Sequence, residues 1–141
     1  NIYGLCCNMS NGFQSTQLMQ QLMKRLNLVN KSMLPILVEG KKDTRCLKDL
    51  GLENRIISLQ RRPLYEVVES IVQLNIKEII LLTDLDKEGK KLFGTLNSNL
   101  TRHGVKVNTK FRNYLWRYTK LRQIEGLKHY LDKLDTSAKD A

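Results

Sequence analysis

The stretch Ile79-Ile80-Leu81-Leu82-Thr83-Asp84-Leu85-Asp86-Lys87-Glu88-Gly89 decides how this chain is expected to fold. Four large apolar residues run directly into two carboxylates that stand one residue apart, and a glycine follows. An unbroken apolar run of this length, bounded by turn residues, is typical of a strand buried on both faces of a parallel sheet. Ionised carboxylates at the end of such a strand are costly unless a cation holds them, so Asp84 and Asp86 are candidate ligands of a divalent ion such as Mg²⁺.

The rest of the chain alternates short apolar runs with segments of helical spacing. This alternation is typical of an α/β protein with a mostly parallel sheet and right-handed crossovers. We therefore expect a Rossmann-like, four-stranded sheet flanked by helices, whose other strands lie at 35–38, 55–59 and 105–107. The expected divisions of the chain are a disordered or cloning-derived leader at 1–13, an N-terminal helix at 14–33, the α/β domain at 34–109 and a basic helical extension at 110–141.

Composition places the chain among ordinary globular proteins and excludes several classes. Of its 141 residues, 41% are hydrophobic and 27% are charged, so a domain with a buried core is expected. No apolar run approaches the roughly 20 residues that a membrane-spanning helix needs, so no membrane partner is expected. Three cysteines, two of them adjacent, do not make a disulfide framework, and a reducing cytoplasm is the expected location.

The positive charge of the chain is concentrated in its last third. The formal net charge is +10, and residues 102–133 hold nine Lys or Arg against two acids. Such a basic segment suits contact with the phosphate backbone of nucleic acid, and Arg112 and Arg117 are candidate contacts. The plain alternative is a solvated helix face.

A third carboxylate, Glu39, follows the predicted strand at 35–38. In a parallel sheet, ligands bind outside the carboxyl ends of the strands, at the point where the strand order reverses. If this strand neighbours the one before Asp84, then Glu39, Asp84 and Asp86 converge on one edge of the sheet. Each also has a plain interpretation, with Glu39 as a turn contact and Asp86 as the N-cap of the next helix.

Other families also place two aspartates one residue apart, and their patterns differ from this one. An EF-hand loop that starts at Asp84 needs a glutamate at its twelfth position, which here is Thr95, and it is entered from a helix. A phosphatase of the haloacid dehalogenase type carries the pair on its first strand, with Thr or Val where this chain has Glu88. A response-regulator receiver needs an isolated aspartate and a late lysine, for which no position is evident.

Two motifs taken together resemble the Toprim domain. The first is Val38-Glu39-Gly40-Lys41-Lys42-Asp43, and the second is Thr83-Asp84-Leu85-Asp86-Lys87-Glu88-Gly89. The domain is shared by topoisomerases, bacterial-type primases, OLD-family nucleases, recombination-repair proteins and the ribonuclease that matures 5S ribosomal RNA. The resemblance covers residues 34–110, and the whole chain is similar to small stand-alone archaeal Toprim proteins.

The resemblance implies a metal site and a catalytic group. It gives Glu39, Asp84 and Asp86 as ligands of one or two Mg²⁺ ions, and Glu39 also as the general acid or base. Lys41 matches a frequent basic position and is a second catalytic candidate, while Gly40 and Gly89 match glycines that let the backbone approach phosphate. Beside this cluster, the cations that could hold the flanking phosphates of a substrate are Lys42, Arg45 and Lys87.

The leading prediction is a Mg²⁺-dependent phosphoesterase that acts on nucleic-acid phosphodiesters, with RNA slightly favoured. The ions would stabilise the charge that develops on the phosphate. The alternative is a non-catalytic RNA- or ribonucleoprotein-binding module that retains the metal site, and a small-molecule phosphohydrolase suits the charge distribution less well. Trp116, which lies off the apolar stripe of its helix, is the better candidate among the tail aromatics for stacking on a base.

Overall fold

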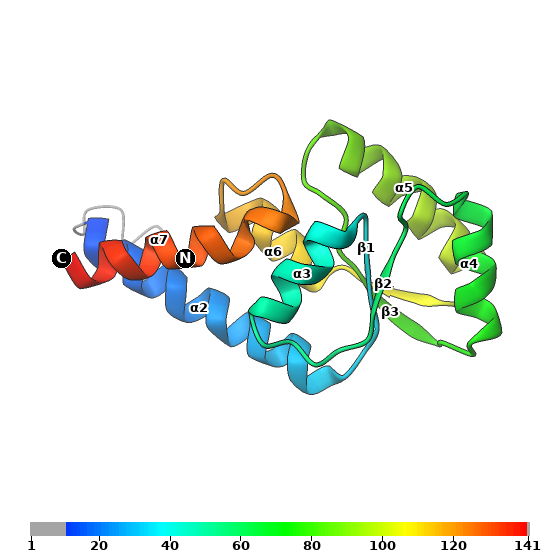
Figure 1. Cartoon of the computed structure of the whole chain (residues 1–141), viewed down its shortest axis with the longest axis horizontal. Helices are drawn as coiled ribbons and strands as arrows, with labels where there is room; N and C mark the ends of the chain where they lie inside the picture. The colour runs from blue at the N-terminus through cyan, green and yellow to red at the C-terminus, as the bar shows by residue number, and fades with distance from the viewer. Residues whose placement is uncertain (1–10, 141) are drawn as a thin grey trace.

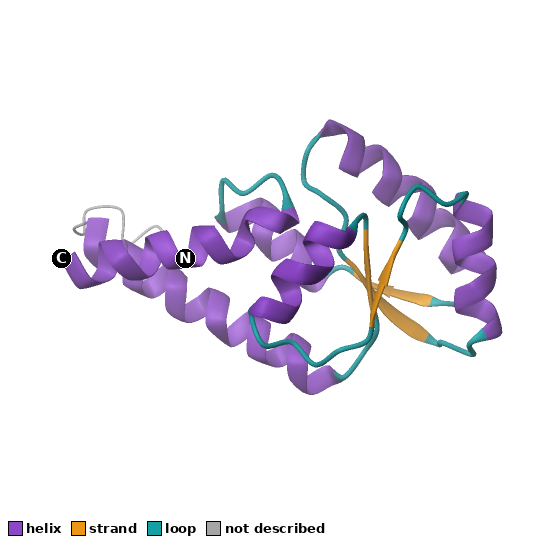
Figure 2. Cartoon of the chain, viewed as in Figure 1, coloured by secondary structure: helices purple, strands orange, loops and turns teal. Residues whose placement is uncertain are grey.

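The structure is a computed structural model that describes residues 11–140, with side chains described from 16 to 136. It confirms the expected α/β class, because a four-stranded, all-parallel sheet lies between two layers of helices (Figure 2). The predicted leader lies mostly outside the described residues, and residues 11–13, its last three, already belong to the first helix.

Helices and strands follow one another along the chain as the sequence alternation predicts (Figure 1). In order, they are α2 (Asn11–Ser32), β1 (Ile36–Val38), α3 (Lys41–Asp49), β2 (Ile56–Ser58), α4 (Leu64–Gln73), β3 (Glu78–Leu81), α5 (Lys87–Arg102), β4 (Lys106–Asn108), α6 (Lys110–Tyr118), the 3-10 turn η2 (Ile124–Gly126) and α7 (Leu127–Asp140). β1, β2 and β3 are shorter than the apolar runs that predicted them, although the run after β3 stays buried through Thr83. β4 has the predicted length and lies one residue later than predicted.

The strand order β2-β1-β3-β4 places the switch point of the sheet between β1 and β3. From β1 the chain moves outward to β2 through α3, and from β2 it crosses back over β1 to β3 through α4. Because crossovers between parallel strands are right-handed, these opposite movements put α3 and α4 on opposite faces of the sheet. β4 lies at an edge of the sheet, next to β3.

Alternate residues of the central strands contribute to two separate hydrophobic cores. On one face, Leu37, Ile79 and Leu81 pack with buried residues of α4 and α5. On the other face, Val38 and Ile80 pack with buried residues of α2, α3, α6 and α7. Since helices cover both faces, the strands are apolar without interruption, and this is the pattern that predicted them.

α2 and α7 lie side by side and extend away from the sheet as a helical arm (Figure 1). Leu22 and Leu26 of α2 are buried with Leu127 and Leu131 of α7, in the same core that covers β1 and β3. The N-terminal helix and the basic extension therefore pack on each other and on the sheet. Among residues 11–140, every helix is too short or too polar to traverse a lipid bilayer.

The basic extension is not one continuous helix, because α6 ends at Tyr118. The hydroxyl of Thr119 donates to the carbonyl of Leu115 at 2.6 Å and accepts a hydrogen bond from the N–H of Leu121 at 3.2 Å. This local bonding ends α6, and residues 119–123, here called the return segment, run irregularly to η2. The return segment crosses back beside the end of β3 and becomes part of the candidate site.

Candidate functional site

The carboxyl ends of β1 and β3 form the candidate site. The register pairs Leu37 with Leu81, so Glu39, two residues on, lies level with Thr83 and next to Asp84. Both acids stand at the switch point, where the chain leaves neighbouring strands in opposite directions and the strand ends are open to a ligand. The structure therefore brings together the two motifs that the sequence analysis paired.

The carboxylate of Glu39 is held against the end of β3. Its Oε2 accepts a hydrogen bond from the backbone N–H of Asp84 at 2.7 Å. Burial raises the pKa of Glu39, the Asp84 N–H lowers it, and the nearby carboxylates of Asp84, Asp43 and Asp86 raise it again, so that the pKa reaches about 7. Glu39 thus keeps a proton into the neutral range unless a cation is nearby.

Asp84 and Asp43 complete a group of partly or fully buried acids around Glu39. Asp84 Oδ1 accepts a hydrogen bond from the backbone N–H of Ile124 at 2.9 Å, and burial is the main cause that raises the pKa of Asp84. Asp43 is 5% exposed, and its Oδ2 accepts a hydrogen bond from the N–H of Gly40 at 3.0 Å. Burial and the charge of Asp84 raise the pKa of Asp43 to about 6. A cation would stabilise such a crowded group of acids.

Asp86 is the N-cap of α5, as its plain interpretation predicts. Its Oδ1 accepts a hydrogen bond from the N–H of Gly89 at 2.8 Å. Gly89 is required by packing, because a Cβ there would overlap the backbone carbonyl of Asp84. A Cβ at Gly40 would meet no atom within 4 Å, so this glycine borders open space. Gly89 therefore supports the loop between Asp84 and Asp86, whereas Gly40 is free to face a ligand.

The three predicted metal ligands do not form a ready-made cage. Within residues 11–140, no group of three or more His, Cys, Asp or Glu side chains is arranged to hold a metal ion. A backbone N–H engages one oxygen of each of Glu39, Asp84 and Asp86, and the three N–H groups belong to different segments. Glu39 and Asp84 lie together, and joint ligation with Asp86 stays a prediction.

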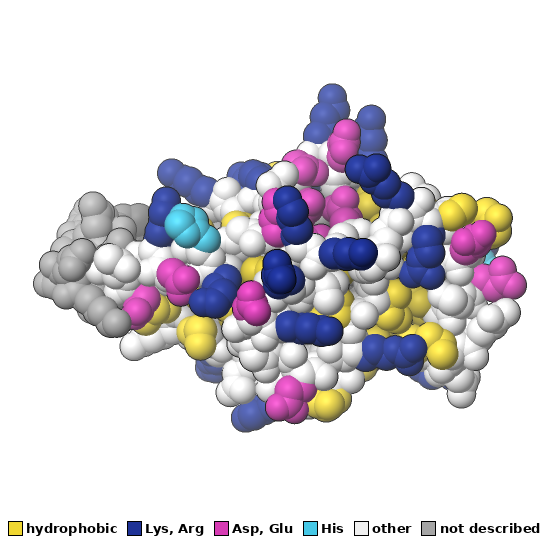
Figure 3. Space-filling view, viewed as in Figure 1, with side chains coloured by type: hydrophobic (Ala, Val, Ile, Leu, Met, Phe, Trp, Pro, Cys, Tyr) yellow, Lys and Arg dark blue, Asp and Glu magenta, His cyan; other side chains and the backbone are white. Residues whose placement is uncertain are grey.

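An open cleft of about 780 Å³ lies over Glu39 and Asp84 and carries basic side chains. Lys41, the second catalytic candidate, and Lys42, a predicted phosphate contact, are exposed on the first turn of α3 and line this cleft. Lys87, at the start of α5, is exposed but does not line it. Figure 3 shows the result, with acidic side chains in the upper part of the molecule surrounded by Lys and Arg.

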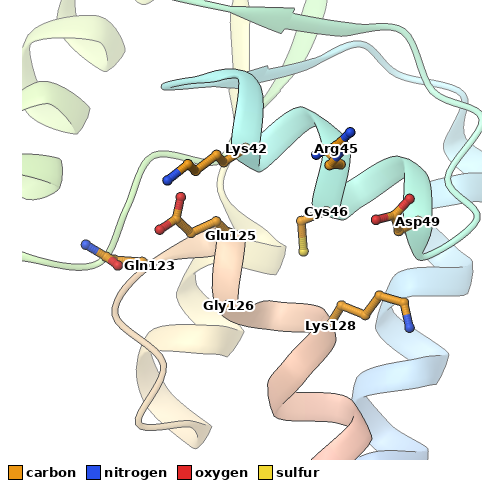
Figure 4. A pocket seen from close by; sticks show the side chains of 8 residues that line it. All are labelled: Lys42, Arg45, Cys46, Asp49, Gln123, Glu125, Gly126 and Lys128. Atoms are coloured by element: carbon orange, nitrogen blue, oxygen red, sulfur yellow. The ribbon is translucent and has the colours of Figure 1, made fainter.

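A second hollow, of about 360 Å³, adjoins the cleft between α3 and the turn from η2 into α7 (Figure 4). Lys42 and Glu125 line both spaces and lie next to each other in Figure 4. Arg45, a predicted phosphate contact, lines this second hollow and not the cleft. Cys46 also lines it, and burial raises the pKa of its thiol, which keeps the sulfur protonated.

The prediction that Arg112 contacts nucleic acid is wrong, because its side chain is only 7% exposed. Its Nε and Nη2 donate to the backbone carbonyls of Thr83 at 3.1 Å and Asp84 at 2.8 Å, and its Cζ lies 4.4 Å from the ring centroid of Phe93. Arg112 therefore fixes the end of β3 from inside the protein. Arg117, on the same helix, is exposed, and its contact with nucleic acid stays a prediction.

Several residues that line the cleft were not predicted from the sequence as site residues. Gln123 and Glu125 are exposed and line the cleft, and the charge of Glu125 raises the pKa of Asp43 and Asp84. Gln60 and Arg61 line it too, with positive φ angles of 48° and 61°. Left-handed backbone at two successive non-glycine residues is uncommon, and neither residue type signals it.

Two archaeal proteins align with most of this chain. A UPF0292 protein of Methanocaldococcus jannaschii is 40% identical over 101 residues, which cover 70% of this chain and 79% of that protein. A UPF0292 protein of Methanosarcina acetivorans is 32% identical over 117 residues, which cover 82% of this chain and 81% of that protein. This chain belongs to the UPF0292 family.

A solved structure also resembles this UPF0292 protein. It is a protein from Aquifex aeolicus with a TM-score of 0.64 and 28% sequence identity, and the alignment covers 75% of this chain and 94% of that one. No protein-family model matches the chain. The α/β fold of this UPF0292 protein is therefore shared by a solved structure.

Proposed function

We propose that this UPF0292 protein is a Toprim-like, Mg²⁺-dependent phosphoesterase that acts on nucleic-acid phosphodiesters, with RNA slightly favoured. The observation that carries the proposal is the meeting of Glu39 and Asp84, from two separate motifs, at the switch point of the parallel sheet. The cleft over these acids is also lined by Lys41, Lys42 and Arg61, whose charges suit the phosphate oxygens of a substrate.

Mg²⁺ fits the chemistry of these residues. It binds oxygen ligands and commonly takes only one or two protein carboxylates, with water and substrate phosphate in its other positions. Glu39 and Asp84 meet that need without a cage of three acids. The raised pKa values of Glu39 and Asp43 support the proposal, because a cation in the cleft would offset both the burial and the repulsion behind them. A bound ion would stabilise the negative charge that develops on the phosphate.

The residues around the carboxylates have distinct roles in this proposal. Lys41 and Lys42, on the first turn of α3, bind the phosphates that flank the scissile bond. Glu39, which the Toprim resemblance gives as the general acid or base, would take a proton from the attacking water or give one to the leaving oxygen. Arg112 and the N–H of Ile124 act as positioning groups, because they hold the backbone and the carboxylate of Asp84.

The test is to incubate labelled RNA, labelled DNA and mononucleotides with Mg²⁺ and wild-type protein, Glu39→Gln or Asp84→Asn. We expect the wild type to cleave nucleic acid and each variant to be slower by about a hundredfold or more, because Glu39→Gln removes the general acid or base and Asp84→Asn removes a charged ligand of the ion. Glu66→Gln removes an exposed acid from α4 and should cleave like the wild type. Equal rates for all four proteins would overturn the site assignment.

The alternative function is a non-catalytic RNA- or ribonucleoprotein-binding module that retains the metal site. The observation that favours it is that the cleft is lined by the exposed cations Lys41, Lys42 and Arg61, which can hold phosphate whether or not a bond is cleaved. If the protein binds RNA but cleaves none of the substrates, the binding-module proposal is supported and the phosphoesterase proposal is contradicted. Under both proposals phosphate contacts supply much of the affinity, so binding should weaken steeply as salt rises, and salt-insensitive binding would exclude both.

A further inference from the structure

Trp116 is the single tryptophan of the chain and differs from its neighbours on α6. Phe111, Tyr114 and Leu115 are buried in the core, whereas Trp116 is 43% exposed. A large aromatic side chain that the core does not use offers a flat apolar surface to a ligand.

Two cationic groups lie over the Trp116 ring. Lys90 Nζ, from α5, is 4.0 Å from the ring centroid, and Arg122 Cζ, from the return segment, is 4.7 Å from it. Both side chains are exposed, and neither forms an ion pair with an acid among the residues whose side chains are described. Trp116, Lys90 and Arg122, here called the Trp116 platform, thus combine an aromatic face with two cations that form no ion pair with any acid whose side chain is described.

The platform is attached to the loop that follows β3. The carbonyl of Arg122 accepts a hydrogen bond from the N–H of Leu85 at 2.7 Å, and the N–H of Lys90 donates to the carbonyl of Asp86 at 3.0 Å. Both cations are therefore bonded through their backbones to the segment that carries the Asp-x-Asp motif. A strand whose phosphate lies at the carboxylate cleft can thus place a neighbouring nucleotide on Trp116.

Positive charge predominates around the platform. Within residues 87–91 and 116–123 there is one acid, Glu88, and the exposed cations are Lys87, Lys90, Lys91, Arg117, Lys120 and Arg122. Figure 3 shows Lys and Arg side chains over the beginning of α5. This charge is complementary to the phosphates of a nucleic acid and unfavourable for a basic protein surface.

We propose that the Trp116 platform binds an unpaired base of a single-stranded nucleic acid, with Lys90 and Arg122 on the adjacent phosphates. The incoming phosphates draw the two cations from the ring, and the base stacks on the exposed indole. Bases inside a duplex stack on each other and cannot lie on the ring, so the platform selects single strands. This inference rests on the proposed action on nucleic acid and narrows its substrate.

The fluorescence of Trp116 reports on the platform directly, because the chain has one tryptophan. In EDTA, a short oligouridylate should quench this fluorescence, whereas an abasic strand or a duplex of the same length should quench it much less. Trp116→Ala should weaken the binding of a dye-labelled oligouridylate by about five- to a hundredfold, the effect of losing one stacked base. The same variant should bind the abasic strand as the wild type does, and Trp116→Phe should keep most of the affinity.

Tyr65→Ala is the matched control, because Tyr65 is an aromatic side chain that is 69% exposed on α4, a helix of the other core. It should bind both strands like the wild type. The platform is overturned if Trp116→Ala binds oligouridylate as tightly as the wild type, or if the abasic strand quenches equally. Base-dependent binding without cleavage would support the platform and contradict the phosphoesterase. Cleavage without base-dependent binding would support the phosphoesterase and contradict the platform.

Discussion

Gly89 sits where the first turn of α5 touches the end of β3. Any side chain at this position would overlap the Asp84 carbonyl, which also accepts a hydrogen bond from Arg112. The resemblance to the Toprim domain predicts phosphate contact for this glycine. Its packing against Asp84 is a sufficient reason for glycine here, and it ties the position of the helix to that of the carboxylate.

Two glycines of α5 allow this effect to be measured. Gly89→Ala should lower the free energy of unfolding by about 1–3 kcal/mol, because the loop after β3 must move to admit the methyl group. Gly94→Ala, which would meet no atom within 4 Å, should instead raise it by about 0.5–1 kcal/mol. Urea denaturation followed by circular dichroism measures both, and equal shifts of the same sign would contradict the packing argument.

Glu39 should make the stability of the metal-free protein depend on pH. Its pKa is about 7 in the folded state and has its ordinary value of 4.5 in the unfolded state. Between these values the folded state binds more protons than the unfolded state, so the free energy of unfolding should fall as pH rises through this window. In EDTA, the melting temperature of the wild type should decrease from about pH 5 to about pH 7, and that of Glu39→Gln should decrease less.

The same melting experiment can be repeated with Mg²⁺. At about pH 8, where Glu39 is ionised, adding Mg²⁺ should raise the melting temperature of the wild type more than that of Glu39→Gln. Glu66→Gln, which replaces an exposed acid on α4, should behave like the wild type both in EDTA and in Mg²⁺. A Glu39→Gln profile that parallels the wild type would show that this carboxyl is not the group with the raised pKa.

The return segment is the element that adds a further wall to the cleft over the two strand ends. Its last residue, Gln123, lines the cleft, and the N–H of Ile124, which follows it, binds the Asp84 carboxylate at 2.9 Å. Arg112, on the helix before the segment, holds the Asp84 carbonyl. Burial lowers the pKa of Arg112 and the charges of nearby acids raise it, so this guanidinium supplies positive charge behind the site.

Arg112→Lys tests whether α6 positions the Asp84 loop. A lysine keeps the charge but cannot reach the carbonyls of both Thr83 and Asp84 with a planar fork, so one buried acceptor loses its partner. The free energy of unfolding should fall by about 1–3 kcal/mol, and Mg²⁺-dependent cleavage should fall with it. Arg117→Lys, an exposed change on the same helix, should alter neither. Wild-type stability in Arg112→Lys would refute the positioning role.

The difference between Glu39 and Glu125 shows what the sequence could and could not predict at this scale. Glu39 was predictable because parallel strands bring their carboxyl ends to one edge of the sheet, so two strand-end acids in sequence imply one site. Glu125 was not, because its place depends on where the return segment crosses the sheet. The hydrogen bond from the Ile124 N–H to Asp84 fixes that crossing. Any residue except proline can supply a backbone N–H, so the sequence does not reveal this donor. The buried role of Arg112 was missed for a similar reason, since its acceptors are carbonyls.

At the scale of the whole molecule, the helical arm and the sheet share one core. Leu127 of α7 is fully buried with Leu26 of α2, Leu47 of α3 and Val38 of β1. The sequence predicted an N-terminal helix and a C-terminal extension as separate additions to the α/β domain. Their apolar stripes are directed at each other as well as at the sheet, and periodicity alone does not say which partner a stripe meets.

A shared core predicts that the arm and the sheet unfold together. Leu127→Ala should lower the free energy of unfolding by about 2–5 kcal/mol, the range for truncating a buried leucine, and the whole protein should still unfold in one transition. Urea curves from helical circular dichroism and from the fluorescence of Trp116, which lies on α6 outside the arm, should therefore shift together. Leu28→Ala, on the arm but with its leucine 55% exposed, should shift neither by more than about 1 kcal/mol. If Leu127→Ala produced an early loss of helix while the fluorescence transition stayed in place, the arm would be an independent unit.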